Sequence, residues 1–127
     1  MDEVDLGVPE PLLESLPEGS EDAIADMQQA VGGWESRIND ALEDADSERE
    51  TAEVLTDAIE LLEDRRRRYD EFVPELRAWG QSPIYAIAWR TLCADLIEQL
   101  YEQGGDAIDR ERNARLVEDG IRFGGED

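Results

Sequence analysis

IYAIAWRTLCADLIEQLY, residues 84–101, is the stretch that decides the fold of this 127-residue chain. Apolar side chains surround most of its helical circumference, and the polar side chains form a narrow strip of Thr91, Asp95 and Glu98, continued by Glu102. A helix with so wide an apolar arc is buried on several sides. Ser82 followed by Pro83 is typical of a helix start, and Gly104-Gly105 of a helix end. We therefore predict a central helix from residue 83 to residue 102.

A first amphipathic helix is predicted upstream, from Ser20 onward. Its apolar residues recur at alternating steps of three and four: Ile24, Met27, Val31, Trp34, Ile38 and Leu42. This spacing places them on one face of a helix. Gly32-Gly33 interrupts the helix at a cost of about 1 kcal/mol per glycine. We therefore expect either a bend there or another backbone packed close.

A second amphipathic helix is predicted to begin at Ser47. Ser47-Glu48-Arg49-Glu50 has the S-x-x-E form of a capping box. The stripe of this helix is Leu55, Ile59, Leu62, Arg66, Tyr69, Val73 and Leu76. Because proline lacks an amide hydrogen and clashes with the preceding turn, Pro74 predicts an end or a kink near Phe72.

The flanking segments complete the predicted organisation. Residues 1–19 hold three prolines among acids and are expected to form a flexible acidic tail or a loosely docked arm, residues 106–119 a short, peripheral fourth helix, and residues 123–127 a tail. The fold class is therefore all-α, an antiparallel bundle of three main helices plus a short fourth helix over residues 20–122. Neither strand alternation nor an internal repeat is present.

The charge indicates the solvent for which the chain is adapted. Asp and Glu number 34 against 12 Lys plus Arg, all of them arginine, so the formal net charge is −22. Self-repulsion of this size strains a compact fold, but the Debye length falls to about 3 Å at 1 M salt. The composition resembles that of cytoplasmic proteins from extreme halophiles. With no signal-peptide pattern and no apolar run of membrane-spanning length, we expect a cytoplasmic location and no membrane partner.

Histidine is absent and Cys93 is the only cysteine. This composition excludes the usual zinc sites, the Ser-His-Asp triad and the Cys-His pair. Cys93 lies among apolar residues of the predicted central helix, where a buried thiol is unreactive. We expect no catalytic residue and no cofactor from these residue types.

Four carboxylates are candidates for a magnesium site: Glu60, Glu63, Asp95 and Glu98. Two acid pairs on facing helices would offer the oxygen ligands that a hard cation prefers. Glu60-Leu61-Leu62-Glu63 is similar to the E-x-x-E half of the motif of the all-α nucleotide pyrophosphohydrolases, and Asp95-Leu96-Ile97-Glu98 carries the acids of the E-x-x-D half in reversed order. The resemblance implies a magnesium-dependent hydrolase of nucleotides. The alternative is that these acids are solvated on exposed helix faces.

Arg65-Arg66-Arg67-Arg68 is the only basic cluster. Arg65, Arg67 and Arg68 are candidates for binding phosphate, since guanidinium groups suit phosphate oxygens. Acids that precede and follow the run favour ion pairs on the helix surface instead. High salt weakens nucleic-acid binding, so we do not expect that partner. Arg66 falls on the apolar stripe and is expected to pair with a carboxylate of another helix or subunit and so set the register.

The sequence thus favours a protein-interaction function without intrinsic catalysis. The apolar surface is generous for one thin bundle, and most soluble oligomers are symmetric homo-oligomers. We expect a homodimer or an accessory subunit of an unidentified protein partner. Trp79, beside Gly80 in a turn, is the candidate for an exposed aromatic contact. The magnesium-dependent hydrolase and the phosphate or nucleic-acid binder are the alternatives.

Overall fold

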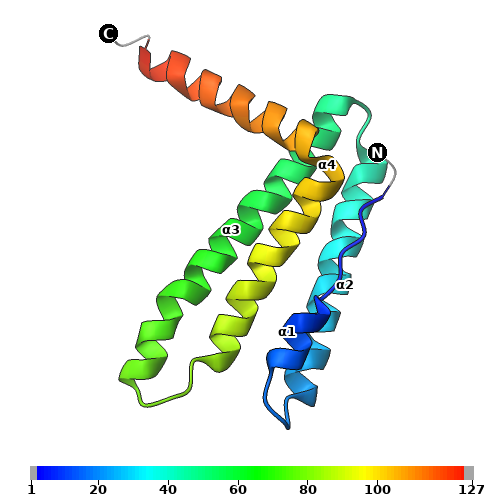
Figure 1. Ribbon diagram of the computed structural model, residues 1–127. Coiled ribbons are helices and arrows are strands. Elements are labelled where there is room, and N and C mark those ends of the chain that lie inside the picture. Colours follow the sequence, from blue (N-terminus) through cyan, green and yellow to red (C-terminus); the bar gives the residue numbers. More distant parts are fainter. Residues whose placement is uncertain (1–2, 125–127) are drawn as a thin grey trace.

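The computed structural model describes residues 3–124 of the chain, and the side chains up to residue 119. Four helices are present within this range: α1 (Glu10–Ser15), α2 (Glu21–Asp44), α3 (Glu48–Ala78) and α4 (Ile84–Gly124) (Figure 1). The described range holds no strand. The predicted all-α fold class is confirmed.

The three long helices lie side by side and alternate in direction (Figure 1). α3 and the first half of α4 form a closely packed hairpin, and α2 lies beside this hairpin with fewer contacts to α3. α4 bends sharply at Gly104, where the backbone leaves the helical region at φ −144° and ψ 30°. Beyond this kink, the second half of α4 leaves the bundle (Figure 1).

The predicted break at Gly104-Gly105 lies where the backbone leaves the helical region, so the helices expected over 83–102 and 106–119 correspond to the two halves of α4. The second half is longer than predicted, because it runs on through Phe123 to Gly124. A glycine pair is a usual cause of a sharp kink. The predicted tail starts inside this helix, and its last three positions, 125–127, lie outside the described residues.

The predicted helix boundaries agree with the structure to different degrees. Ser47 caps α3 as expected, since its hydroxyl accepts a hydrogen bond from the amide of Glu50 at 3.1 Å. Ser20 precedes α2 but makes no capping bond; its hydroxyl donates to the carbonyl of Pro17. Pro74 does not end α3, which continues to Ala78.

The glycine pair in α2 has no backbone of another described segment packed against it. α2 runs unbroken from Glu21 to Asp44. A Cβ atom added at Gly32 or Gly33 would meet no other atom within 4 Å. Since no backbone packs against these exposed glycines, they lower the stability of the helix without a packing reason inside this chain.

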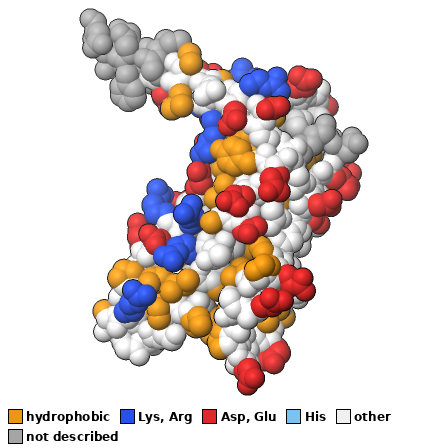
Figure 2. All heavy atoms as spheres, viewed as in Figure 1, with side chains coloured by type: hydrophobic (Ala, Val, Ile, Leu, Met, Phe, Trp, Pro, Cys, Tyr) orange, Lys and Arg blue, Asp and Glu red, His pale blue; other side chains and the backbone are white. Residues whose placement is uncertain are grey.

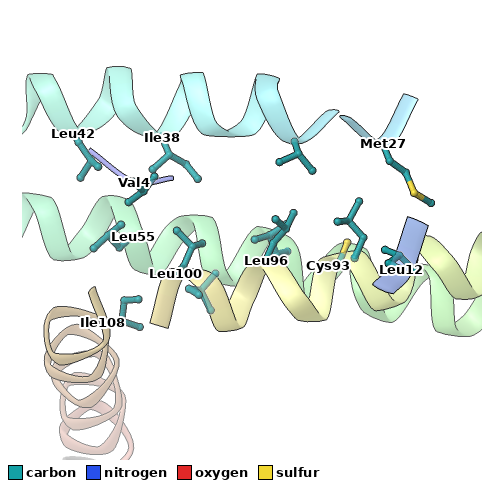
Figure 3. Close-up of a cluster of buried hydrophobic side chains, with 14 of the residues drawn as sticks. Val4, Leu12, Met27, Ile38, Leu42, Leu55, Cys93, Leu96, Leu100 and Ile108 are labelled. Atoms are coloured by element: carbon teal, nitrogen blue, oxygen red, sulfur yellow. The ribbon is translucent and has the colours of Figure 1, made fainter. Parts of the chain in front are cut away.

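The core forms where the predicted stripes meet (Figure 3). Val31 of α2 and Leu62 of α3 are each 3% exposed, and Leu92 of α4 is fully buried. Other core residues share the same stripes: Met27, Ile38, Leu42, Leu55, Ile59, Leu96 and Leu100. The helical periodicity therefore identified the buried faces correctly.

Of the two expectations for the N-terminal segment, a flexible tail or a loosely docked arm, the structure has a docked arm, which is packed closely against the bundle. Val4 is fully buried and belongs to the core, beside Ile38 and Leu42 of α2 (Figure 3). Leu12 of α1 is 8% exposed and belongs to the same cluster. The first nineteen residues therefore complete the core.

Candidate functional site

The second half of α4 is anchored on α3 by ion pairs. Arg112 donates to Glu63 at 2.5 Å, and Arg115 donates to both Asp57 and Glu60 at 3.0 Å. These three acids lie at intervals of three residues on α3, which places them on one face. The projecting segment is thus held mainly by charge, with Ile108 as its fully buried apolar residue.

Glu111 is the buried acid of this network. Its side chain is 3% exposed and lies 3.6 Å from Arg49 of α3 and 3.8 Å from Arg115. A buried carboxylate needs such partners, because desolvation of an unpaired charge is costly. The hydroxyl of Tyr101, together with Glu63, raises the pKa of Arg112 above its ordinary value. The charges that position the segment therefore persist at every pH at which the acids are ionised.

The predicted magnesium ligands do not converge. Glu60 and Glu63 are paired with Arg115 and Arg112, whereas Asp95 accepts a hydrogen bond from Gln99 on another side of the bundle. Glu98 is exposed. Between residues 3 and 119, no three acidic or sulfur-bearing side chains are grouped to hold a metal ion. The geometry does not support the magnesium site.

The arginine run is divided among several surfaces. Arg65 turns inward and places its guanidinium 5.4 Å from the ring centre of Trp34, a cation–π contact between α3 and α2. Arg67 and Arg68 both pair with Asp64. The three predicted phosphate ligands therefore do not face one point.

Arg66 does not occupy the inward position that the stripe predicted. It is exposed and lines a polar hollow with Glu63, Arg67, Asp70 and Arg90. Arg90 of α4 pairs with Asp70 of α3 at 2.6 Å. Figure 2 shows the basic side chains that gather on this flank, with acids between them.

Trp79 is exposed, as expected, with 63% of its surface accessible. Its ring packs edge-on against Phe72, with the ring centroids 6.3 Å apart. Both residues belong to the end of α3 that faces the turn to α4. They form a small aromatic patch.

Another apolar surface lies on the projecting segment of α4. Leu116 is 68% exposed and Val117 is 59% exposed, although the neighbouring Arg112 and Arg115 face α3. Two adjacent aliphatic side chains are thus left in water on a helix that points away from its own bundle (Figure 1).

An apolar groove opens between α2 and α3. It encloses about 260 Å³ and is lined by apolar residues that include Trp34, Ile38, Ala58, Leu61 and Leu62, with Arg37 and Asp57 also in its wall. Leu61 is 50% exposed there. Asp57 also pairs with Arg115, so the groove and the root of the projecting segment meet at this residue.

The N-terminal arm lies in a polar site between α2 and α4. We call this site, formed by Glu35, Asn39, Gln99 and Gln103, the seat. Asn39 of α2 accepts from the amide of Val4 at 2.8 Å and donates to its carbonyl at 3.1 Å. Gln103 of α4 makes the same pair of bonds with Asp5, both at 2.7 Å.

The next two residues of the arm repeat this pattern. Glu35 of α2 accepts from the amide of Leu6 at 2.7 Å. Gln99 of α4 accepts from the amide of Gly7 at 3.0 Å and donates to its carbonyl at 2.9 Å. Sequence reasoning missed this seat; its one local signal is the spacing of four residues in Glu35/Asn39 and Gln99/Gln103.

These features define an all-α protein that exposes apolar side chains on its helices. The chain belongs to a family of unknown function, DUF7971, which matches residues 1–125. No curated protein and no solved structure matches it. Within the described part of the chain, none of the helices combines the length and apolarity required to cross a membrane.

Proposed function

We propose that this protein is a helical interaction module of a salt-adapted cell, which associates with a second copy of itself through the projecting segment of α4. The observation that carries the proposal is the exposure of Leu116 and Val117 on a segment that Arg112 and Arg115 tie to α3. Burial of two aliphatic side chains contributes about 1.5–3 kcal/mol each. The ion pairs orient the segment in advance, which lowers the entropic cost of association.

The projecting segment of one copy binds in the α2–α3 groove of the other copy. Its apolar lining suits aliphatic side chains, and the exposed Arg37 in its wall has no ion pair among the described residues. Asp119 follows closely after Val117 on the segment, so the two surfaces are complementary in charge as well as in polarity. A two-fold dimer uses both surfaces twice.

The salt dependence of this dimer distinguishes it from an electrostatic complex. Two chains of charge −22 repel each other, and about 1 M salt shortens the range of that repulsion to about 3 Å. We therefore expect association to strengthen as KCl rises, whereas a complex held by opposite charges weakens.

Light scattering on the purified chain tests the proposal. We expect twice the chain mass in about 2 M KCl, and the mass of one chain for the double variant Leu116→Glu/Val117→Glu. Trp79→Ser is the matched control, because it removes an equally exposed apolar residue elsewhere. A wild-type monomer contradicts the proposal. If the dimer is lost only in Trp79→Ser, the contact instead lies at the turn between α3 and α4.

A further inference from the structure

We infer that the seat between α2 and α4 is a binding site for an extended polypeptide segment, and that its second occupant is the N-terminal arm of another copy. Two copies then exchange residues 4–7. This inference deepens the proposed self-association by naming a segment that passes between the chains, and it stands on a different surface from Leu116 and Val117.

The seat forms hydrogen bonds with the main chain of the arm. All seven hydrogen bonds that tie residues 4–7 to the helices, at 2.7–3.1 Å, use backbone amides or carbonyls of the arm. Asn39, Gln99 and Gln103 each donate to and accept from one arm residue. Any extended segment offers the same donors and acceptors, so this part of the binding does not depend on the arm belonging to the same chain.

The spacing of the polar side chains fits an extended strand. Residues four apart on a helix are about 6 Å apart along its axis, and residues two apart on a strand are about 6.6 Å apart. Val4 and Leu6 therefore reach Asn39 and Glu35 of α2, while Asp5 and Gly7 reach Gln103 and Gln99 of α4. The arm runs opposite to both helices and ties them together.

Two side chains of the arm add selectivity. Val4 is fully buried in the core. Leu6 is half-buried and lines the α2–α3 groove, whereas Asp5 points to solvent. The seat thus selects valine and leucine at alternate positions. A second copy carries this sequence by identity, which is why we assign it as the occupant.

The connection to α2 permits exchange. Residues 8–20 contain Pro9, Pro11 and Pro17, the six-residue helix α1, and Gly19 with φ +85°. Exchange of an identical element keeps every contact of the closed form. The arm of the same chain competes at a millimolar effective concentration. Exchange therefore prevails where the chain's own arm is weakened, or where another contact, such as that of the projecting segments of α4, already holds the two copies together.

A complementation experiment tests the exchange. The first full-length chain carries Val4→Asp, which places a charge in the core and empties the seat. The second carries Gln99→Ala/Gln103→Ala, which keeps the arm and removes its clamps on α4. Both chains also carry Leu116→Glu/Val117→Glu, so contact through α4 cannot join them. Glu98→Gln/Glu102→Gln, two exposed positions of α4, replaces the clamp variant in the control mixture.

The readout is hydrogen exchange at the amides of residues 4–7 in the second chain, together with native mass spectrometry. We expect a mixed dimer in molar KCl and at least tenfold slower exchange of these amides after the Val4→Asp chain is added. The control chain with Glu98→Gln/Glu102→Gln keeps its clamps on α4, so we expect no change in the hydrogen exchange of its residues 4–7. Folded chains that show neither a mixed dimer nor slower exchange overturn the inference, without bearing on the Leu116 contact.

If the Val4→Asp chain does not fold, a chain that carries Asp5→Pro takes its place. Asp5→Pro removes the amide that donates to Gln103 and leaves the Val4 side chain intact. The same mixed dimer and the same slower exchange are expected. If a synthetic peptide of residues 1–9 binds the Val4→Asp chain or the Asp5→Pro chain while the second chain does not, the seat takes another partner's segment, and the assignment of a second copy is wrong.

Discussion

Arg112 of α4 donates a hydrogen bond to Glu63 of α3 at 2.5 Å, across 49 positions of sequence. The pair joins the projecting segment to the hairpin just beyond the kink at Gly104. It also gives Glu63 a structural partner, where the sequence pattern predicted a metal ion. The direction of the projecting segment is therefore set by this pair and by the neighbouring pairs of Arg115.

Glu63→Gln is expected to lower stability and to leave the response to magnesium unchanged. Because both side chains are partly exposed, at 43% and 32%, we expect a loss of about 0.2–1 kcal/mol in the free energy of unfolding. Urea unfolding at constant KCl measures it. Glu102→Gln, an exposed acid outside the predicted magnesium site, is the control. A magnesium-dependent rise in the melting temperature at fixed ionic strength that disappears in Glu63→Gln would restore the metal site.

Gly32→Ala and Gly33→Ala are each expected to stabilise the chain by about 0.5–1 kcal/mol. The added Cβ meets no atom within 4 Å, and both positions are helical. Gly80→Ala is the opposing control, since its φ of +73° disfavours an L side chain. The urea midpoint reports both effects. Destabilisation by alanine at position 32 or 33 in the dimer, but not in the monomer, would reveal a close approach by the second copy.

Thr56→Val is expected to be neutral or stabilising. Thr56 is fully buried and its hydroxyl has no hydrogen-bond partner among the described residues. Replacement by a methyl group of similar shape removes the cost of a desolvated, unsatisfied hydroxyl, about 1–3 kcal/mol. Thr56→Ala, which removes the hydroxyl and leaves a small cavity, serves as the comparison. If Thr56→Val instead lowers the melting temperature more than Thr56→Ala does, the hydroxyl has a partner, such as buried water.

Cys93 is expected to make stability fall at alkaline pH. Burial raises the pKa of its thiol from 9.0 to about 11, although Arg65 and Arg66 act to lower it. The raised pKa contributes stability that is present in full below pH 9, where the thiol is protonated in both states. That contribution is lost as the pH rises through 9 toward 11, because only the unfolded chain then ionises.

The loss amounts to roughly 3 kcal/mol for a shift of two pKa units. The difference in unfolding free energy between wild type and Cys93→Ala, measured from pH 8 to about pH 11, isolates it from other groups. We expect the two curves to converge as the pH rises. Parallel curves would show that the thiol titrates alike in both states. Alkylation of native Cys93 at neutral pH, faster than unfolding allows, would contradict its burial.

Local pattern was sufficient for the helices and their buried faces. Residues spaced by three and four in 24–42, 55–76 and 84–101 share a face whatever surrounds them, and Val31, Leu62 and Leu92 are buried as predicted. The Ser47 cap also involves near neighbours only. Such features depend on contacts within one or two helical turns, so the sequence by itself determined them.

Long-range contacts decided the rest. Asp5 meets Gln103 across 98 positions and Val4 meets Asn39 across 35, and no periodic pattern marks such pairs. The choice between Arg65 and Arg66 as the inward residue depended on how α3 twists against α2. The kink at Gly104 brought Arg112 and Arg115 to the acids of α3 and left Leu116 and Val117 in water. Only the tertiary structure decides these points, because each depends on the relative placement of two helices that local energetics leave free.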